Sequence, residues 1–256
     1  MTKLKNSLIF ITGASAGIGE ACARAFAAEG ARLLLAARRV DRLRALEPEL
    51  RKAGAPDVHS IALDVRNASA VESTLSSLPE NWCSIDILVN NAGLSRGLDK
   101  LHNGKLQDWE EMIDTNIKGV LYVTRAVVPG MVARGRGHVV NLGSTAGELT
   151  YPGGAVYCAT KAGLKAINDG LRMDLLGTPV RVTSVDPGMV ETEFSEVRFH
   201  GDKERAAKVY QGLIPLTAKD VADAIVWAVS RPAHVNIAHV LLTSVDQANS
   251  LLFNRK

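Results

Sequence analysis

The fold is decided by the stretch TGASAGIG, residues 12–19, which follows the apolar run LIFI at residues 8–11 and leads into an alanine-rich segment. The apolar run predicts a buried β-strand, and the alanine-rich segment predicts a helix. Between them, Gly13 permits a tight turn, while Gly17 and Gly19 permit close approach of the backbone to a bound group. Because the unpaired N–H groups at a helix N-terminus attract anions, the stretch predicts a pyrophosphate-binding turn.

The rest of the chain repeats this alternation of short apolar runs and longer helical patterns. Most of the runs are continuously apolar, as expected for parallel strands that helices cover on both faces. We expect strands at residues 7–11, 32–36, 58–63, 85–89, 138–142, 180–185 and 239–243. We expect helices at residues 17–29, 40–53, 68–78, 108–133, 155–176 and 218–229. The alternation predicts an α/β fold with a single domain, residues 1–256, built on a doubly wound parallel sheet.

Residues 191–215 break this regular pattern. Phe194, Val197 and Phe199 lie among charged residues without a clean period, and prolines flank the segment. Such a segment lacks the periodicity of a core helix or strand. We therefore expect an integral, mobile lid over a pocket.

The end of the second expected strand carries AARR, residues 36–39. Sites for dinucleotides often have an acidic residue here that binds the ribose 2′-OH. A carboxylate would repel a 2′-phosphate, whereas the guanidinium of Arg38 or Arg39 can bind it through two charge-assisted hydrogen bonds. A helix N-terminus prefers acidic residues, so the helix that follows does not explain the arginines. The sequence therefore predicts NADP(H) rather than NAD.

A second constellation lies in and just before the expected helix at residues 155–176. Tyr157 and Lys161 are four residues apart, so both project from one helix face, and Ser144 lies just past the fifth strand. A lysine ammonium about 4 Å away would lower the pKa of the tyrosine from roughly 10 toward about 7. Ser144 would hold a substrate oxygen while Tyr157 exchanges its proton. The three side chains together predict a proton-transfer site.

Taken in chain order, these motifs resemble the short-chain dehydrogenase/reductase family over nearly the whole length. The family pattern is matched by the glycine-rich turn, by NNAG at residues 90–93, by Asn116 and Ser144, and by Tyr157 with Lys161. The resemblance implies a seven-stranded Rossmann sheet and hydride transfer between a nicotinamide and a carbonyl or alcohol. It implies catalytic roles for Ser144, Tyr157 and Lys161, with Asn116 supporting a proton-relay water. It implies cofactor contacts at Gly13, Ser15, Gly17, Ile18, Gly19, Arg38, Arg39, Asp64, Val65, Asn91, Ala92, Gly93, Tyr157, Lys161, Pro187, Gly188, Val190 and Thr192.

Within the family, the chain is more similar to the NADP-dependent serine and 3-hydroxy acid dehydrogenases. That group includes L-allo-threonine dehydrogenase and malonic semialdehyde reductase. The resemblance lies in residues 116–119, 141–147 and 232–237, and above all in VETEFSEVRF at residues 190–199. The last segment lies in the expected lid, so it bears on the substrate as well as on the fold.

A substrate that carries a carboxylate needs a cation or a cluster of amides. Arg198, in the expected lid, is the candidate for this role. A solvated lid charge or a salt bridge between subunits is an equally open explanation of Arg198. Tyr151 and Arg96 are weaker candidates near the mouth of the pocket.

Composition and charge argue against several other classes of protein. The chain of 256 residues, 46% of them hydrophobic, is long enough to bury a sizeable core. Its 30 Lys and Arg residues are scattered and nearly balanced by 27 Asp and Glu, so we expect no nucleic acid partner. The first apolar run is too short for a signal peptide or a membrane span, and the three cysteines form no CxxC pair, which suits the cytoplasm. The histidines lack metal-ligand spacing, so we expect no metal.

The sequence thus predicts a cytoplasmic, NADP-dependent short-chain alcohol dehydrogenase or carbonyl reductase. Its expected substrate is a small 3-hydroxy acid or β-hydroxy amino acid, of the serine, allo-threonine and 3-hydroxypropionate class. Two alternatives remain open: a sister reductase of ketones, 3-oxoacyl thioesters or other bulky carbonyls, and a non-catalytic NADP-binding redox sensor. The family resemblance also implies a homotetramer. The physiological substrate, the stereochemistry, the direction of flux and the role of residues 251–253 stay open at this point.

Overall fold

Seven strands form one parallel sheet in the computed structural model, which describes residues 4–256. Their order is β3-β2-β1-β4-β5-β6-β9, so the order reverses between β1 and β4. The bounds are β1 Leu8–Thr12, β2 Arg32–Ala37, β3 Val58–Ala62, β4 Ile87–Asn90, β5 Gly137–Leu142, β6 Val180–Pro187 and β9 His239–Leu242. The expected strands are confirmed to within about two residues at each end, as boundaries of this kind allow.

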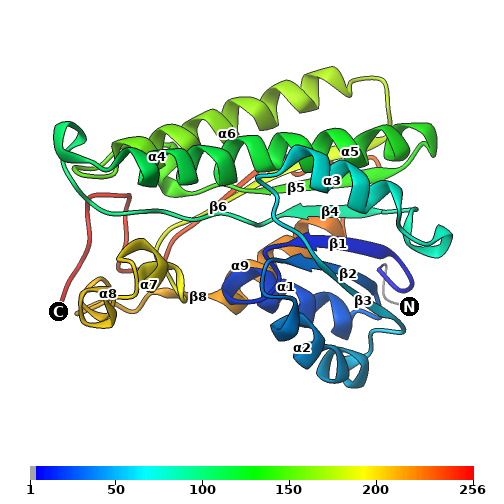
Figure 1. The fold of residues 1–256 in the computed structure, drawn as a ribbon, viewed down its shortest axis with the longest axis horizontal. Coiled ribbons are helices and arrows are strands. Elements are labelled where there is room, and N and C mark those ends of the chain that lie inside the picture. Colours follow the sequence, from blue (N-terminus) through cyan, green and yellow to red (C-terminus); the bar gives the residue numbers. More distant parts are fainter. Residues whose placement is uncertain (1–3) are drawn as a thin grey trace.

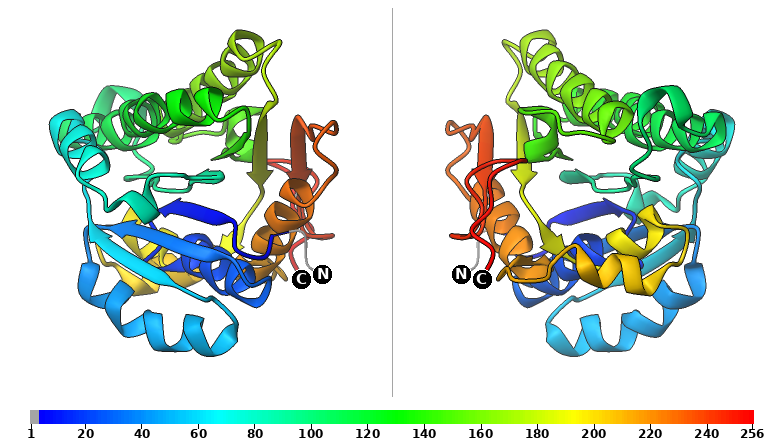
Figure 2. Two further views of the ribbon diagram at one scale, coloured as in Figure 1. Left: turned by 90° about the vertical axis from the view of Figure 1, so that its right-hand side faces the viewer. Right: turned by 90° about the vertical axis from the view of Figure 1, so that its left-hand side faces the viewer.

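Helices cover both faces of the sheet (Figure 1). One layer holds α1 Gly17–Ala28, α2 Val40–Ala53 and α9 Ala218–Val229, and the other holds α3 Ala68–Ser76, α4 Leu106–Ile113, α5 Gly119–Ala133 and α6 Ala155–Asp174. Figure 2 shows the same two layers from the sides. Short 3₁₀ helices lie at Glu80–Trp82, Leu101–Asn103 and Thr145–Gly147. Within residues 4–256, no helix has both the length and the apolar character needed to cross a membrane.

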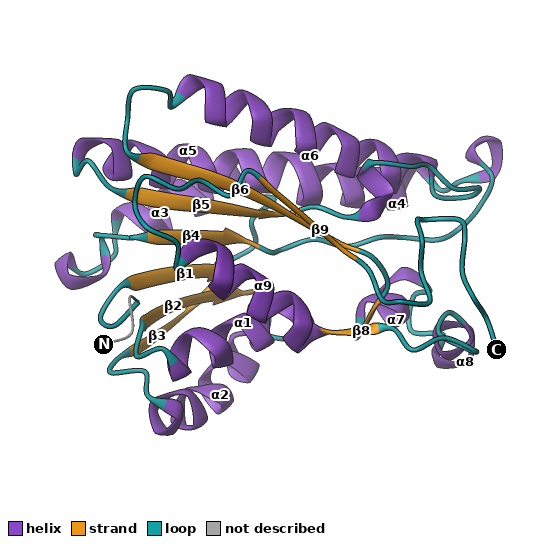
Figure 3. Cartoon of the chain, turned by 180° about the vertical axis from the view of Figure 1, so that it is seen from behind, coloured by secondary structure: helices purple, strands orange, loops and turns teal. Residues whose placement is uncertain are grey.

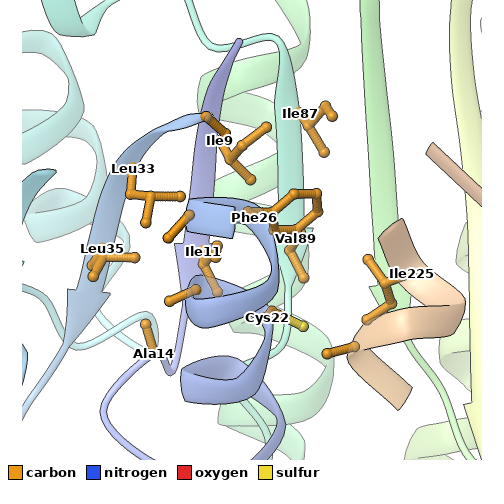
Figure 4. Packing of buried hydrophobic residues seen from close by; sticks show 14 of the residues in the cluster. Ile9, Ile11, Ala14, Cys22, Phe26, Leu33, Leu35, Ile87, Val89 and Ile225 are labelled. Atoms are coloured by element: carbon orange, nitrogen blue, oxygen red, sulfur yellow. The ribbon is translucent and has the colours of Figure 1, made fainter. Parts of the chain in front are cut away.

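The strands are apolar throughout because side chains on both faces of the sheet are buried. Ile9 and Ile11 of β1 pack with Phe26 of α1 in one core cluster (Figure 4). Leu8 and Phe10 alternate with them and belong to a second cluster, which includes residues of α5. None of these five side chains is more than 1% exposed. The period of two along a strand, with both faces covered, therefore explains the continuous apolar runs.

The expected helix at residues 108–133 is confirmed, but it is not a regular α-helix throughout. In the structure, α4 and α5 are joined by a π-helical segment, Asp114–Lys118. Turns of this kind are rare in proteins and often lie at functional sites. Apolar periodicity does not reveal this one, because a single wider turn hardly changes which residues face the core. The buried Asn116 lies within it.

The chain leaves the main sheet after β6. β7 Val190–Glu191 pairs in parallel with β8 Leu216–Thr217, so the two ends of the intervening segment lie together. Between them are two short helices, α7 Phe194–Arg198 and α8 Lys203–Lys208, which lie beyond one end of the main sheet (Figure 3). The expected lid at residues 191–215 thus has helical turns that its sequence pattern does not indicate. Its mobility stays a prediction.

Candidate active site

A cleft of about 360 Å³ lies at the carboxyl ends of the parallel strands. Its walls come from the segments that follow β1, β2, β3, β4, β5 and β6, together with the first part of the lid segment, residues 191–215. The cleft therefore spans the point between β1 and β4 where the strand order reverses. Open α/β sheets bind their ligands at this position.

The glycine-rich turn forms one wall of the cleft. Gly13 and Gly17 have φ angles of +65° and +55°, a region of backbone conformation that favours glycine. A Cβ atom on Gly13 would lie 2.9 Å from the Cα of Ala92, in the loop after β4. Thr12 fixes this close approach, because its Oγ1 accepts hydrogen bonds of 3.1 Å from the backbone N–H groups of Asn91 and Ala92.

Gly19 lies deeper than the other glycines of the turn, and its expected contact with a cofactor stays a prediction. It does not line the cleft, and a Cβ atom there would overlap the Gly13 carbonyl oxygen and the Asn91 side chain. Tight packing of α1 against the turn therefore requires glycine at this position. The other residues expected to contact a cofactor all line the cleft: Gly13, Ser15, Gly17, Ile18, Arg38, Arg39, Asp64, Val65, Asn91, Ala92, Gly93, Tyr157, Lys161, Pro187, Gly188, Val190 and Thr192.

Arg38 and Arg39 lie at one end of the cleft, beside the glycine-rich turn. Their side chains are 56% and 47% exposed, so water reaches both guanidinium groups. Arg39 donates a hydrogen bond of 3.4 Å from Nε to the Ser15 hydroxyl, which ties it to the start of α1. Two cations close to a helix N-terminus form a favourable site for an anionic group.

Arg66 adds a third cation to the cleft, and the sequence analysis missed it. Its guanidinium donates hydrogen bonds of 3.0 and 2.6 Å to Asp64, and these bonds hold the pKa of Asp64 below its ordinary value. Glu111 lies 3.6 Å from Arg66 and accepts a 2.7 Å hydrogen bond from Arg96. Arg96, a weak substrate candidate, is thus paired with a carboxylate and lies outside the cleft lining. Arg66 could have been predicted to line the cleft, because it is only two positions after Asp64 in the sequence.

The other end of the cleft holds the expected proton-transfer residues. Tyr157 and Lys161 come from α6 and are 8% and 7% exposed, and Ser144 follows β5. Ser144 forms a side-chain hydrogen bond with Tyr157. Lys161 donates a 2.6 Å hydrogen bond from Nζ to the carbonyl of Leu142, and its Nζ is 5.9 Å from the centroid of the Tyr157 ring. The structure therefore brings the three residues together, in low-dielectric surroundings.

Burial has the largest effect on the pKa of Tyr157. Loss of hydration, followed by the effect of Tyr151, raises the pKa of the phenol well above its ordinary value of 10.0. The charge of Arg198 and the hydrogen bond with Ser144 lower this pKa, but by less. Burial therefore outweighs any lowering by the protein's own groups, and a lowering toward neutrality by Lys161 together with a bound, oxidised nicotinamide stays a prediction. At neutral pH, Tyr157 is a protonated phenol, which is the form that donates a proton.

Lys161 has a buried counter-charge that the sequence analysis did not find. Burial lowers the pKa of Lys161 to about 8, and the charge of Asp186 acts in the opposite direction. Asp186 is 2% exposed, accepts a 2.5 Å hydrogen bond from Ser184 Oγ and lies 2.7 Å from Nε2 of His239. A Cβ atom on Gly143 would overlap the Asp186 carboxylate, so the glycine after β5 provides the space for this group.

Asp186 also belongs to a small charged cluster. Within the part of the chain that the structure describes, Glu148, Asp186 and His239 have potential ligand atoms that all lie within 4.8 Å of one another. Lys165 donates a 2.5 Å hydrogen bond to Glu148, so this carboxylate already has a cationic partner. The arrangement is that of an ion-pair network.

Asn116 connects the loop after β4 to α6. Its Oδ1 accepts a 2.9 Å hydrogen bond from the backbone N–H of Leu94, and its Nδ2 donates to the Leu94 carbonyl at 2.8 Å. Nδ2 also donates to Thr160 Oγ1 at 3.0 Å. The side chain is 1% exposed and does not line the cleft. These contacts give Asn116 a positioning role, and its support of a proton-relay water stays a prediction.

Arg198 of α7 lies beside Tyr157, although neither Arg198 nor Tyr151 is among the residues that line the cleft. Its guanidinium carbon lies 5.4 Å from the Tyr157 ring centroid and 5.2 Å from that of Phe194. Nη2 donates a 2.9 Å hydrogen bond to the Tyr151 hydroxyl, so the two expected substrate residues are in contact. Its Nε is buried and has no hydrogen-bond partner among residues 4–256. A buried donor of this kind, on a cation beside Tyr157, is suited to an anionic oxygen.

The residues of the cleft fit a dinucleotide that carries an extra phosphate. The cradle at Gly13 and Gly17 is closed to larger side chains, since a Cβ atom on Gly17 would lie 3.3 Å from the Thr192 side chain. Arg38 and Arg39 lie at the end of the cleft where that cradle begins, and the buried Tyr157 lies at the other end. The cleft thus offers cations for phosphate and a proton donor for a reacting group.

A doubly wound sheet with this cleft, a glycine-rich turn and a buried Ser-Tyr-Lys group defines a nucleotide-dependent dehydrogenase fold. The chain belongs to the short-chain dehydrogenase family, whose profile matches residues 7–203. The NADP-dependent 3-hydroxy acid dehydrogenase YdfG of Salmonella typhi is 50% identical over 242 residues, which are 94% of this chain and 96% of that protein. The serine 3-dehydrogenase of Agrobacterium fabrum is 45% identical and covers 94% of each chain. The closed form of serine dehydrogenase complexed with NADP+ has a TM-score of 0.91 and 48% identity, covering 97% of this chain and 99% of that one.

Proposed function

We propose that this protein is an NADP-dependent oxidoreductase that transfers a hydride between nicotinamide and a small 3-hydroxy acid or β-hydroxy amino acid. The observation that carries the proposal is the Arg198 guanidinium, which lies 5.4 Å from the ring of the buried Tyr157. A cation is thus next to the proton donor, where a substrate carboxylate would be bound. The 3-hydroxy acid and serine dehydrogenases among the relatives support this substrate class.

The cofactor is held by groups along the whole cleft. The glycine-rich turn, with Ser15 and Ile18, would hold the pyrophosphate, and Arg38 and Arg39 would hold the 2′-phosphate. Asp64 and Val65 would contact the adenine, and Lys161 would bind the nicotinamide ribose. The remaining contacts would come from the other lining residues: Asn91, Ala92, Gly93, Tyr157, Pro187, Gly188, Val190 and Thr192. When bound, NADP supplies the chemistry of hydride transfer at its nicotinamide ring.

The protein itself moves the proton. In the reductive direction, Tyr157 donates its phenolic proton to the substrate carbonyl oxygen, and Ser144 holds that oxygen by a hydrogen bond. In the oxidative direction, the Tyr157 oxygen takes the proton of the substrate hydroxyl. The Lys161 ammonium favours the deprotonated tyrosine that remains after donation, and Asp186 keeps this ammonium charged. Asn116 holds the loop after β4 in place.

Substrate selection is the part of the proposal that an experiment tests most easily. Arg198→Ala should raise the KM for 3-hydroxy acids by about tenfold or more, because a charge-assisted hydrogen bond to the carboxylate is lost. The KM for an uncharged secondary alcohol should change little. Arg205→Ala is the matched control, since Arg205 lies in α8 of the same lid segment and contacts Phe199 rather than Tyr157.

Equal effects of Arg198→Ala on acids and alcohols would remove the carboxylate-binding role. Activity that is confined to bulky, uncharged carbonyls would favour a sister reductase with the same catalytic residues. Binding of NADPH without turnover on any substrate would favour the redox sensor.

We also propose that the enzyme is a cytoplasmic homotetramer. Large apolar side chains on the outer surfaces of α4, α5 and α6 support an assembly through these helices, because Ile113, Leu121 and Met173 are 40%, 42% and 70% exposed. Sedimentation of the purified protein would give the number of subunits. A monomer at micromolar concentration would contradict the proposal.

A further inference from the structure

A carboxylate from the lid segment lies among the arginines of the cofactor end. Glu193 Oε2 accepts a 2.9 Å hydrogen bond from Arg39 Nη1, and its Oε1 accepts a 2.6 Å hydrogen bond from Arg42 Nη1. Glu193 also lines the cleft, together with Arg38 and Arg39. These contacts join positions about 150 residues apart in sequence, which is why the periodicity of α2 shows Arg42 only as part of a solvated face.

The position of this carboxylate is unexpected from the sequence of the second strand. Residues 36–39 contain two arginines and no acidic residue, which is the pattern that favours a 2′-phosphate. Glu193 adds a carboxylate beside Arg39 from a different part of the chain, whereas Asp64, which also lines the cleft, is bonded to Arg66. Hydrogen bonding to Arg42 lowers the pKa of Glu193, so the carboxylate is charged at neutral pH. It therefore offsets part of the positive charge of the arginines.

We propose that Glu193 is a specificity-determining residue that limits the preference of this enzyme for NADP over NAD. A 2′-phosphate and the Glu193 carboxylate are both anions, and both need the guanidinium of Arg39. They compete for its hydrogen bonds and repel each other at short range. NAD carries a neutral 2′-OH at the same place, so its binding meets no such repulsion. The carboxylate thus weakens the binding of NADP selectively.

The size of the effect follows from the exposure of the groups. The side chains of Arg39, Arg42 and Glu193 are 47%, 50% and 42% exposed, so solvent screens their interactions. Neutralising the carboxylate should therefore change the ratio of kcat/KM for NADP+ to kcat/KM for NAD+ by roughly fivefold rather than by orders of magnitude. Salt should reduce the difference further, because the repulsion acts between hydrated charges.

Glu193→Gln tests the proposal, because it removes the charge and keeps the shape of a half-exposed side chain. The full-length variant should bind NADP+ more tightly, by about fivefold at low ionic strength, with an unchanged or weaker affinity for NAD+. Isothermal titration with each cofactor and steady-state kinetics give the ratio. The matched control is Glu196→Gln, which removes the same charge from α7, and it should leave the ratio unchanged.

A ratio that stays the same or falls in Glu193→Gln would overturn the proposal, since Glu193 would then be neutral toward the phosphate or would help to position the arginines. An equal rise in Glu196→Gln would overturn it as well, because any charge of the lid segment would then have the same effect.

The inference rests on the proposed NADP site, and Arg39→Ala distinguishes a failure of the Glu193 proposal from a failure of that site. If Arg39→Ala leaves the ratio unchanged, the proposed phosphate site is wrong. If Arg39→Ala lowers the ratio and Glu193→Gln fails to raise it, only the role of Glu193 is wrong.

Discussion

The two ends of the cleft use charged residues in different ways. At the reacting end, Tyr157, Lys161 and Asp186 are 8%, 7% and 2% exposed, so their charges interact where little water can screen them. At the cofactor end, the side chains of Arg38 and Arg39 are about half exposed. Because the strength of an ionic interaction depends on the local dielectric, the same kind of contact has a stronger effect at the first end than at the second.

Because of this difference in exposure, the charged residues at the reacting end control proton transfer, whereas those at the cofactor end attract the ligand. Buried charges shift the pKa values of their neighbours, and they therefore control the proton transfer. Exposed charges attract an anionic ligand without changing the chemistry of the site. Substitutions at the reacting end should thus change turnover and its pH dependence. Substitutions at the cofactor end should change the KM for the cofactor and should depend on salt.

The largest effect is expected from Tyr157→Phe. The change removes the hydroxyl group that exchanges the proton, so turnover should fall by about 10²- to 10⁴-fold. The affinity for NADPH should stay nearly the same, because the phenyl ring still fills the buried position. Steady-state absorbance assays and a fluorescence titration with NADPH measure the two quantities. Turnover close to that of the wild type would show that another group transfers the proton.

A smaller effect is expected from Arg39→Ala at the cofactor end. Loss of one charge-assisted contact should raise the KM for NADP+ by about tenfold, with little change in kcat or in the KM for NAD+. The effect should shrink as salt is added. Arg44→Ala is the matched control, because Arg44 lies in α2, the helix that Arg39 precedes, is 69% exposed and has a 4.0 Å contact with Asp41. Equal changes for both cofactors would contradict the phosphate site.

The smallest of the three effects is a shift of the pH profile by Asp186→Asn. Burial lowers the pKa of Lys161 to about 8, and Asp186 opposes this change, so removal of the carboxylate should lower the pKa further. Lys161 then loses its charge at a lower pH, and the fall in carbonyl reduction on the alkaline side should begin at lower pH. A displacement of about one pH unit corresponds to a change of about 1.4 kcal/mol in the Lys161 environment.

The control for this shift is Glu148→Gln, which removes an exposed carboxylate of the same cluster. It should leave the profile nearly unchanged. An unshifted profile in Asp186→Asn, with turnover reduced equally at every pH, would mean that the carboxylate has only a structural role.

The main features of the fold could be predicted from sequence because they depend on local pattern. Continuous apolar runs identify strands whose two faces are both covered, as Leu8 and Ile9 illustrate. The expected strands are confirmed, and so is the glycine-rich turn with its positive φ angles at Gly13 and Gly17. The π-helical segment around Asn116 could not be predicted, because one wider turn leaves the apolar pattern almost unaltered.

The candidate site was predictable where its residues directly follow a strand or share a helix face. Arg38 and Arg39 at the end of β2 are of this kind. The charged partners of these residues come from distant segments, and local pattern contains no information about them. Glu193 belongs to the lid segment, and its hydrogen bond with Arg39 joins two residues that are 154 positions apart in the sequence. Asp186 directly precedes Pro187 and Gly188, residues that are typical of exposed turns. The local sequence therefore does not indicate that its carboxylate is buried.

The most direct test of the account is an activity panel that follows the absorbance of NADPH. NADP+ and NAD+ are each combined with L-serine, L-allo-threonine, 3-hydroxypropionate, 3-hydroxybutyrate and a simple secondary alcohol, and NADPH-driven reduction of matching carbonyls is measured in parallel. The account predicts turnover of the acids with NADP+, weaker turnover with NAD+ and little with the alcohol. Turnover only of bulky, uncharged carbonyls, or equal use of the two cofactors, would contradict it.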